Sequence, residues 1–146
     1  MPGRDDAGLA PVLLAASERA SVLRHSFVGP EHLLVALAGE GPDPAARVLS
    51  SLGLAADTLL ARVVEVVGVG RADPPVGPLP LTPRAARVVA AAAVQARDLG
   101  SPHVGPEHLL LAVVGEESVA VTVLGRCGVS ALRVRREVLT VLLAAE

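Results

Sequence analysis

Two Gly-Pro-Glu-His segments hold the residues of this chain whose types and spacing could do chemistry. They place Glu31 and His32 in the first half and Glu107 and His108 in the second. Each Gly-Pro pair predicts a tight turn into a helix, with proline and then an acid in the first turn, where the helix dipole favours negative charge. A carboxylate there can capture a guanidinium through two hydrogen bonds. First-turn acids also simply stabilise helices, by about 0.3–1 kcal/mol each, so both interpretations stay open.

The histidines and the cysteine do not form a catalytic or metal-binding motif. A zinc-binding helix needs two histidines one turn apart, whereas His32 and His108 stand 76 positions apart. We expect both to hydrogen-bond a neighbouring loop, because buried polar groups usually find partners. Cys127 follows Arg126 in an otherwise apolar stretch and is typical of a packed free thiol. We therefore expect no catalytic residue, no metal and no cofactor; a small hydrolase that uses the histidines is the enzymatic alternative.

A second candidate for ligand binding lies at the start of the second half. The sequence Leu81-Thr82-Pro83-Arg84 opens a long Ala-rich segment, with Thr82 as the expected N-cap and Pro83 at the first helical position. The unpaired amides and the hydroxyl at such a helix start suit an anion. The glutamate carboxylates would bind a positive charge and this helix start a negative one. Together they would recognise a group that carries both charges.

Composition excludes several classes of function. The 146 residues have a formal net charge of −2, one Phe and no Tyr or Trp, and all 13 basic residues are Arg. A chain without stacking aromatics or positive charge is not suited to nucleic acid. Without lysine it cannot form a Schiff base or a P-loop. We expect a binding protein without a nucleic-acid partner.

The apolar segments do not predict a membrane protein. No uninterrupted apolar run approaches the roughly 20 residues that a membrane span requires. The residues before the apolar stretch 9–16 include Asp5 and Asp6, whereas a secretion signal has positive charge there. One cysteine fits a reducing compartment. We expect a cytoplasmic protein with no membrane partner.

The chain is an internal duplication. Residues 28–40 and 104–116 are identical at 10 of 13 aligned positions. The first repeat spans about residues 8–67 and the second about residues 82–143. They are joined by a linker, residues 68–81, with four prolines and three glycines. We expect a single domain, residues 1–146, in which the two repeats pack as pseudo-symmetric halves.

Each repeat is expected to form four helices. The valines stand at helical rather than alternating spacing, which argues against strands. Capping residues and glycines mark the ends of each segment. The expected helices span about residues 8–24, 30–38, 44–52, 57–67, 82–99, 105–115, 118–126 and 130–143. The predicted fold is all-α, with eight helices in two four-helix repeats.

These segments resemble the N-terminal domain of the Clp unfoldases of the AAA+ class, especially the ClpC type. The resemblance covers about residues 9–143. It rests on Gly-Pro-Glu-His-Leu-Leu in both halves, each followed by Gly-Glu, on Leu-Thr-Pro-Arg-Ala-Ala-Arg-Val at 81–88 and on Leu-Gly at 52–53. It implies a free-standing Clp N-domain without an ATPase module. It also implies docking of protein substrates and adaptors, and regulation or mimicry of a full-length Clp ATPase.

The resemblance further implies recognition of phosphoarginine on proteins marked for degradation. In the ClpC type two helix-start glutamates hold the guanidinium, and they match Glu31 and Glu107. The phosphate is held near the start of each repeat's first helix, where Thr82, Pro83 and Arg84 keep the family's pattern. We expect the site of the second half to be the competent one.

This sequence departs from the family's pattern at two places. Asp6, Ala7 and Gly8 stand at the start of the first repeat's first helix, and an aspartate there would repel phosphate. Pro30 and Pro106 stand where the family has threonine before the glutamate, which removes a hydroxyl and an N–H from each pocket.

The same resemblance implies an alternative function, sequestration of cyclic-peptide antibiotics. Such antibiotics bind this domain type in actinobacteria, beside the first helices of the two repeats. Leu81 stands in a region where the family often has aromatic residues, which argues against these ligands. The Ala- and Val-rich composition with arginine as the sole basic residue is compatible with the GC-rich genome of an actinobacterium.

Overall fold

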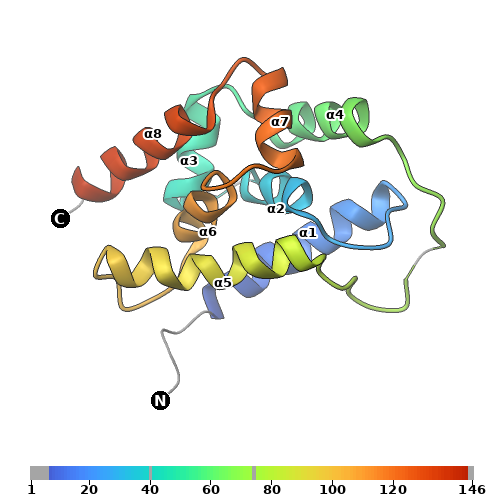
Figure 1. Cartoon of the computed structure of the whole chain (residues 1–146), viewed down its shortest axis with the longest axis horizontal. Helices are drawn as coiled ribbons and strands as arrows, with labels where there is room; N and C mark the ends of the chain where they lie inside the picture. Colours follow the sequence, from blue (N-terminus) through green and yellow to red (C-terminus); the bar gives the residue numbers. More distant parts are fainter. Residues whose placement is uncertain (1–6, 40, 74, 145–146) are drawn as a thin grey trace.

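The structure, a computed structural model, describes residues 7–39, 41–73 and 75–144. This part of the chain forms eight α-helices and no strand, preceded by a 3-10 turn, Ala7–Leu9 (Figure 1). The helices are α1 (Ala10–Val22), α2 (Pro30–Leu37), α3 (Pro44–Ser51), α4 (Ala56–Val67), α5 (Pro83–Asp98), α6 (Pro106–Val113), α7 (Val119–Arg126) and α8 (Ala131–Ala144). The all-α prediction is confirmed, and each helix end lies within two residues of the expected one.

Side-chain caps and prolines explain where several helices begin. The Asp43 carboxylate accepts a hydrogen bond from the Ala46 N–H at 3.0 Å, and the Thr82 hydroxyl accepts one from the Ala85 N–H at 3.0 Å. Each supplies a partner to a first-turn amide that the helix itself leaves unpaired. Gly100, with φ 73°, adopts the left-handed conformation after α5 that favours glycine.

The hydrophobic core lies around α2 and α6, the two helices that carry the repeated motif. Six of the eight residues of each are buried. Helix α1 packs on α2 as α5 packs on α6, while α7 packs on α4 and α3 on α8. The third helix of each repeat therefore lies on the fourth helix of the other, and one hydrophobic core contains residues of both repeats. No helix in the described ranges is long and apolar enough to cross a membrane.

The linker is tied to the first repeat by backbone hydrogen bonds. The Gly70 N–H donates to the Leu23 carbonyl at 2.8 Å, and the Ala72 N–H donates to the Arg24 carbonyl at 2.9 Å. Farther along, the Val28 N–H donates to the Pro80 carbonyl at 2.8 Å, and the Thr82 N–H donates to the Val28 carbonyl at 2.9 Å. The end of the linker thus holds the start of α5 beside the turn that leads into α2.

Candidate functional site

The starts of α2 and α6 are built alike, from a glycine, a proline, a glutamate and a histidine. The Gly29 N–H donates to His32 Nδ1 at 2.9 Å, and the Gly105 N–H donates to His108 Nδ1 at 2.9 Å. Each histidine thus binds back to the residue before its own helix, as the third residue of a capping box does. Both are buried, and both hydrogen-bond the preceding turn, as expected from the sequence.

The first repeat extends this contact into a chain of two histidines. His32 Nε2 lies 2.8 Å from His25 Nδ1, and His25 Nε2 lies 2.9 Å from the Gly68 carbonyl. His32 Nδ1 accepts from Gly29, so its proton sits on Nε2 and is donated to His25, which in turn donates to Gly68. All three hydrogen bonds can form together only when both imidazole rings are neutral. The pair ties the end of α4 to the turn before α2.

Burial keeps both capping histidines neutral. It lowers the pKa of His32 from 6.5 to about 4, with His25 as the second cause. Burial also lowers the pKa of His108, against an opposing effect of the Glu107 carboxylate. Neutral rings are what the hydrogen bonds require, since Nδ1 has to accept. The histidines therefore act as structural caps of the two helix starts.

The carboxylates of Glu31 and Glu107 fold back over the glycine at their helix start. A Cβ placed on Gly29 would touch the Glu31 carboxylate, and one on Gly105 would lie 2.5 Å from Glu107 Oε1. A side chain at either position would have to displace the carboxylate, whereas the backbone of Gly29 is extended, a conformation that any residue adopts. Within residues 7–39, 41–73 and 75–144 neither glutamate lies in an ion pair.

Glu31 shares a cavity with the start of α5. This cross-repeat pocket has a volume of about 560 Å³. The first repeat contributes Glu31 and the second contributes Thr82 and Arg84, and Arg84 donates a hydrogen bond to the Glu117 carbonyl. The remaining lining residues are Gly29, Pro30, Glu117, Ser118, Val119 and Thr122. One cavity thus contains the Glu31 carboxylate of one repeat and, from the other, the Thr82 hydroxyl and the Arg84 guanidinium, with Glu117 as a second acid in its lining.

This geometry regroups the residues that the sequence singled out. The site expected in the second half combines Thr82 and Arg84 with Glu107, but Glu107 does not line the cross-repeat pocket. Alignment of two repeats shows which residues are equivalent, not which are adjacent. The hydrogen bonds between Val28 and the end of the linker hold the start of α5 close to Glu31 of the first repeat.

The other predicted residues lie around this pocket. Leu81 is half-buried and forms an isolated bridge with Val28, while Pro83 is exposed at the first position of α5. Pro30 is buried in the pocket wall. Asp6 lies outside the described residues. A Cβ on Gly8 would lie 3.1 Å from the Val104 carbonyl oxygen, so the first repeat begins close to the turn that leads to Glu107.

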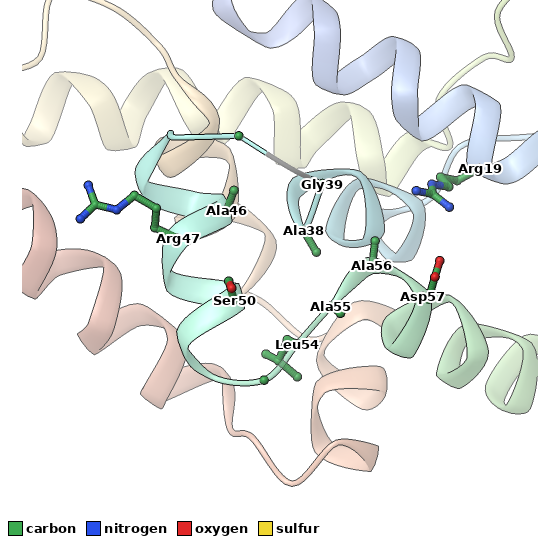
Figure 2. A pocket seen from close by; sticks show the side chains of 12 residues that line it. Arg19, Ala38, Gly39, Ala46, Arg47, Ser50, Leu54, Ala55, Ala56 and Asp57 are labelled. Atoms are coloured by element: carbon green, nitrogen blue, oxygen red, sulfur yellow. The ribbon is translucent and has the colours of Figure 1, made fainter.

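A larger cavity, of about 860 Å³, lies between the end of α2, α3 and the start of α4 (Figure 2). Its walls consist mainly of small residues such as Ala38, Ala46 and Ala55. Figure 2 shows Arg47 pointing away from the opening, with Arg19 and Asp57 on the opposite side. None of the residues predicted for ligand binding lines this cavity. Its size alone does not define a ligand.

The described residues give little support for a catalytic nucleophile or a metal-binding site. In this part of the chain no three His, Cys, Asp or Glu side chains gather as a metal ion would require. Burial raises the pKa of the Cys127 thiol, which keeps it protonated and weakens it as a nucleophile. The arrangement of charges in the cross-repeat pocket is suited to holding a ligand.

Sequence comparison connects this fold to one family. The model of the Clp repeat (R) N-terminal domain family matches residues 8–127 and residues 80–144. The chaperone protein ClpB of Oceanobacillus iheyensis is 40% identical over 143 residues, which are 97% of this chain and 17% of that protein. The chloroplastic chaperone protein ClpC of Pisum sativum is 40% identical over 129 residues, 88% of this chain and 14% of that protein. The chain spans less than a fifth of these relatives.

Solved structures show the same fold. The N-terminal domain of the chaperone ClpD from Arabidopsis thaliana matches with a TM-score of 0.78 at 22% identity, over 95% of this chain and 94% of that one. The Hsp104 N-terminal domain from Candida albicans matches with a TM-score of 0.71 at 16% identity, over 92% and 89% of the two chains. At these identities the likeness concerns the fold alone.

Proposed function

The chain belongs to the Clp repeat (R) N-terminal domain family, and from that premise we propose that it is a binding module and not an enzyme. The family expected from the repeated Gly-Pro-Glu-His segments is confirmed. In Clp unfoldases this domain is a non-catalytic module that binds substrates and adaptors. The proposed ligand is an arginine side chain phosphorylated on its guanidinium, displayed by a protein substrate, and the proposed site is the cross-repeat pocket.

One observation supports this proposal above the others: a single cavity contains the Glu31 carboxylate together with Thr82 and Arg84. A carboxylate accepts two parallel hydrogen bonds from a guanidinium. Arg84 can donate in the same way to a phosphoryl group. The Thr82 oxygen accepts from Ala85 and still has its own hydrogen to donate. The start of α5 adds the positive end of a helix dipole.

Calorimetric titration with free phosphoarginine tests the site. We expect Glu31→Gln, which keeps the size of the side chain and removes its charge, to weaken binding about tenfold or more, because a hydrogen bond to a charged group contributes about 1.5–3 kcal/mol. Glu107→Gln is the matched control at the equivalent position of α6 and should retain the parent affinity. Arginine and inorganic phosphate, titrated separately, should each bind more weakly. Equal affinities of the parent and Glu31→Gln would refute the proposed site.

We also propose that the partner proteins belong to a Clp system of the cytoplasm, with a full-length Clp ATPase among them. The names of the relatives, chaperone proteins ClpB and ClpC, support such a partner. The single cysteine fits a reducing compartment. Immobilised parent and Glu31→Gln protein, exposed to native lysate, provide the test. We expect arginine-phosphorylated peptides to be enriched by the parent alone; equal recovery on both would contradict the proposal.

A second candidate function, sequestration of apolar cyclic peptides, is favoured by one groove. This groove, of about 440 Å³, lies between α1 and the linker and is lined by Leu14, Val22, Pro75 and Pro78, among others. Leu14 and Val22 are exposed by 53% and 69%. Sequestration would protect cells that overproduce the chain from a Clp-directed cyclic peptide, and Leu14→Ser should remove that protection. Unchanged sensitivity on overproduction would exclude this function.

A further inference from the structure

A second cavity adjoins the cross-repeat pocket. This linker pocket has a volume of about 380 Å³ and lies where the turn after α1, the end of α4 and the linker meet (Figure 1). The two cavities share Gly29, Glu31 and Thr82 as lining residues. A ligand group bound at Glu31 therefore has a neighbouring space into which the rest of a polypeptide can extend.

The linker pocket offers an apolar surface. Phe27 and Val67 both line it and are exposed by 52% and 41%. Phe27 is the single aromatic residue of the chain, and its neighbour Val28 is fixed by two hydrogen bonds to the end of the linker. An exposed aromatic side chain on a fixed backbone is the kind of residue that anchors a partner's apolar side chain.

The linker pocket also carries positive charge. Arg24 and Arg71 line it, and within the described ranges neither forms an ion pair. Arg24 donates to the backbone carbonyls of Ala72 and Arg71, which positions its guanidinium without neutralising it. Glu31 is the one acid among the lining residues that the structure describes. Once Glu31 holds a ligand's guanidinium, two positive charges remain, and they favour a negatively charged neighbour.

The wall of the linker pocket is formed in advance. The linker is held by the bonds from Gly70 to Leu23 and from Ala72 to Arg24, and His25 holds Gly68. A wall already fixed by hydrogen bonds loses little conformational entropy when a ligand binds. The linker pocket is therefore preformed, and its wall does not have to become ordered when a ligand binds.

We propose that the linker pocket selects the residues beside the bound arginine, and that it favours an apolar side chain together with a carboxylate. The apolar side chain packs on Phe27 and Val67, and the carboxylate pairs with Arg24 and Arg71. This inference rests on the proposed function, because it assigns the neighbouring residues of the same ligand. The substrate class is thus an unfolded segment in which a phosphoarginine stands within two residues of a leucine or similar side chain and an aspartate or glutamate.

Fluorescence anisotropy with three kinds of labelled decapeptide tests the inference. The plain peptide has phosphoarginine among Gly and Ser residues. The flanked peptide adds Leu and Asp within two residues of the phosphoarginine, on its N-terminal or its C-terminal side in two versions. The third peptide has the same Leu and Asp but Ala in place of phosphoarginine. We expect one flanked version to bind at least about fivefold more tightly than the plain peptide, from added apolar burial and charge pairing.

The double variant Phe27→Ala/Arg71→Gln should remove that gain and leave binding of the plain peptide unchanged. Leu132→Ala/Arg133→Gln on α8 is the matched control, because Leu132 is exposed by 55% and α8 lies at the opposite end of the molecule from the turn after α1 (Figure 1). The control should keep the parent's preference for the flanked peptide.

The outcomes separate the two proposals. If the flanked peptides bind no more tightly than the plain one, or if the gain survives in Phe27→Ala/Arg71→Gln, the linker pocket is not a specificity site while phosphoarginine binding stands. If the flanked and third peptides bind equally, and only through Phe27 and Arg71, the linker pocket is supported and the phosphoarginine proposal fails. If none of the peptides binds, both proposals fail.

Discussion

Burial of His32 makes the stability of the protein depend on pH. Its pKa is 6.5 in a free chain and about 4 in the folded protein, first through burial and second through His25. Between these values the unfolded chain binds a proton that the folded protein does not. The contribution is therefore fully present above pH 6.5 and is lost as the pH falls towards 4. The interval between the two pKa values corresponds to roughly 3 kcal/mol.

Urea unfolding followed by circular dichroism at pH 7.5 and pH 5.0 measures this effect. We expect the free energy of unfolding of the parent to be about 2 kcal/mol lower at pH 5.0 on account of His32 alone. His32→Gln should show a smaller decrease, because glutamine at the third helical position still caps but does not titrate. His103→Gln changes an exposed histidine and is the control. Equal decreases in the parent and in His32→Gln would show that His32 is not the cause.

The position of the Glu31 carboxylate can be tested without removing its charge. In Gly29→Ala the new methyl group occupies the space of that carboxylate, while the backbone at φ −101° and ψ 175° accommodates alanine. We expect phosphoarginine affinity to fall about fivefold, the equivalent of one hydrogen bond, and stability to change by less than about 1 kcal/mol. Gly105→Ala displaces Glu107 in the same way and should leave the affinity unchanged. A loss of similar size in both variants would argue against a site at Glu31.

At the scale of elements, the linker is the segment whose contacts with the rest of the chain were least predictable. Its four prolines and three glycines predict an irregular loop, and it is one. Its hydrogen bonds to Ser17, Leu23, Arg24 and Val28 could not be predicted, because they join positions far apart in the sequence. Gly70 is the one residue that could have indicated this attachment. A Cβ there would overlap the Arg24 carbonyl oxygen, so the position requires glycine because two backbones approach closely.

Two glycine substitutions in the linker test this attachment. Gly70→Ala forces the linker away from Arg24 and should lower the free energy of unfolding by about 1–3 kcal/mol, with faster hydrogen exchange at Ala72. Gly77→Ala meets no atom within 4 Å and should be neutral or stabilising by up to about 1 kcal/mol. If the two variants are equally stable and exchange alike, the linker is not held as the structure shows.

Helices were predictable where their signals are local. Asp43, Thr82 and Ser118 lie within three residues of the amides that they cap, and the repeated motif fixed α2 and α6. The candidate residues Glu31, Thr82 and Arg84 could be named for the same reason. Their grouping could not, because the cross-repeat pocket depends on how two repeats pack. Phe27 and Arg71 were missed: they belong to no motif, and only the folded linker brings them together.

On the scale of the whole molecule, the two repeats share one core. Leu34 on α2 and Leu110 on α6 are fully buried at equivalent places. We expect Leu34→Ala and Leu110→Ala each to lower the free energy of unfolding by about 2–5 kcal/mol, in one cooperative transition, because each leaves a cavity in the same core. Far-UV circular dichroism and amide NMR provide the probes. Strongly unequal losses, or a transition in two steps, would show repeats that fold independently.

In the proposed function, residues of both repeats hold one ligand in the cross-repeat pocket. The most direct measurement is an NMR titration of the ¹⁵N-labelled chain with free phosphoarginine. We expect the amide signals of Glu31 and His32 to shift together with those of Arg84 and Ala85, with one common dissociation constant. Shifts confined to one repeat, shifts centred on Glu107, or no saturable shift at all would contradict it.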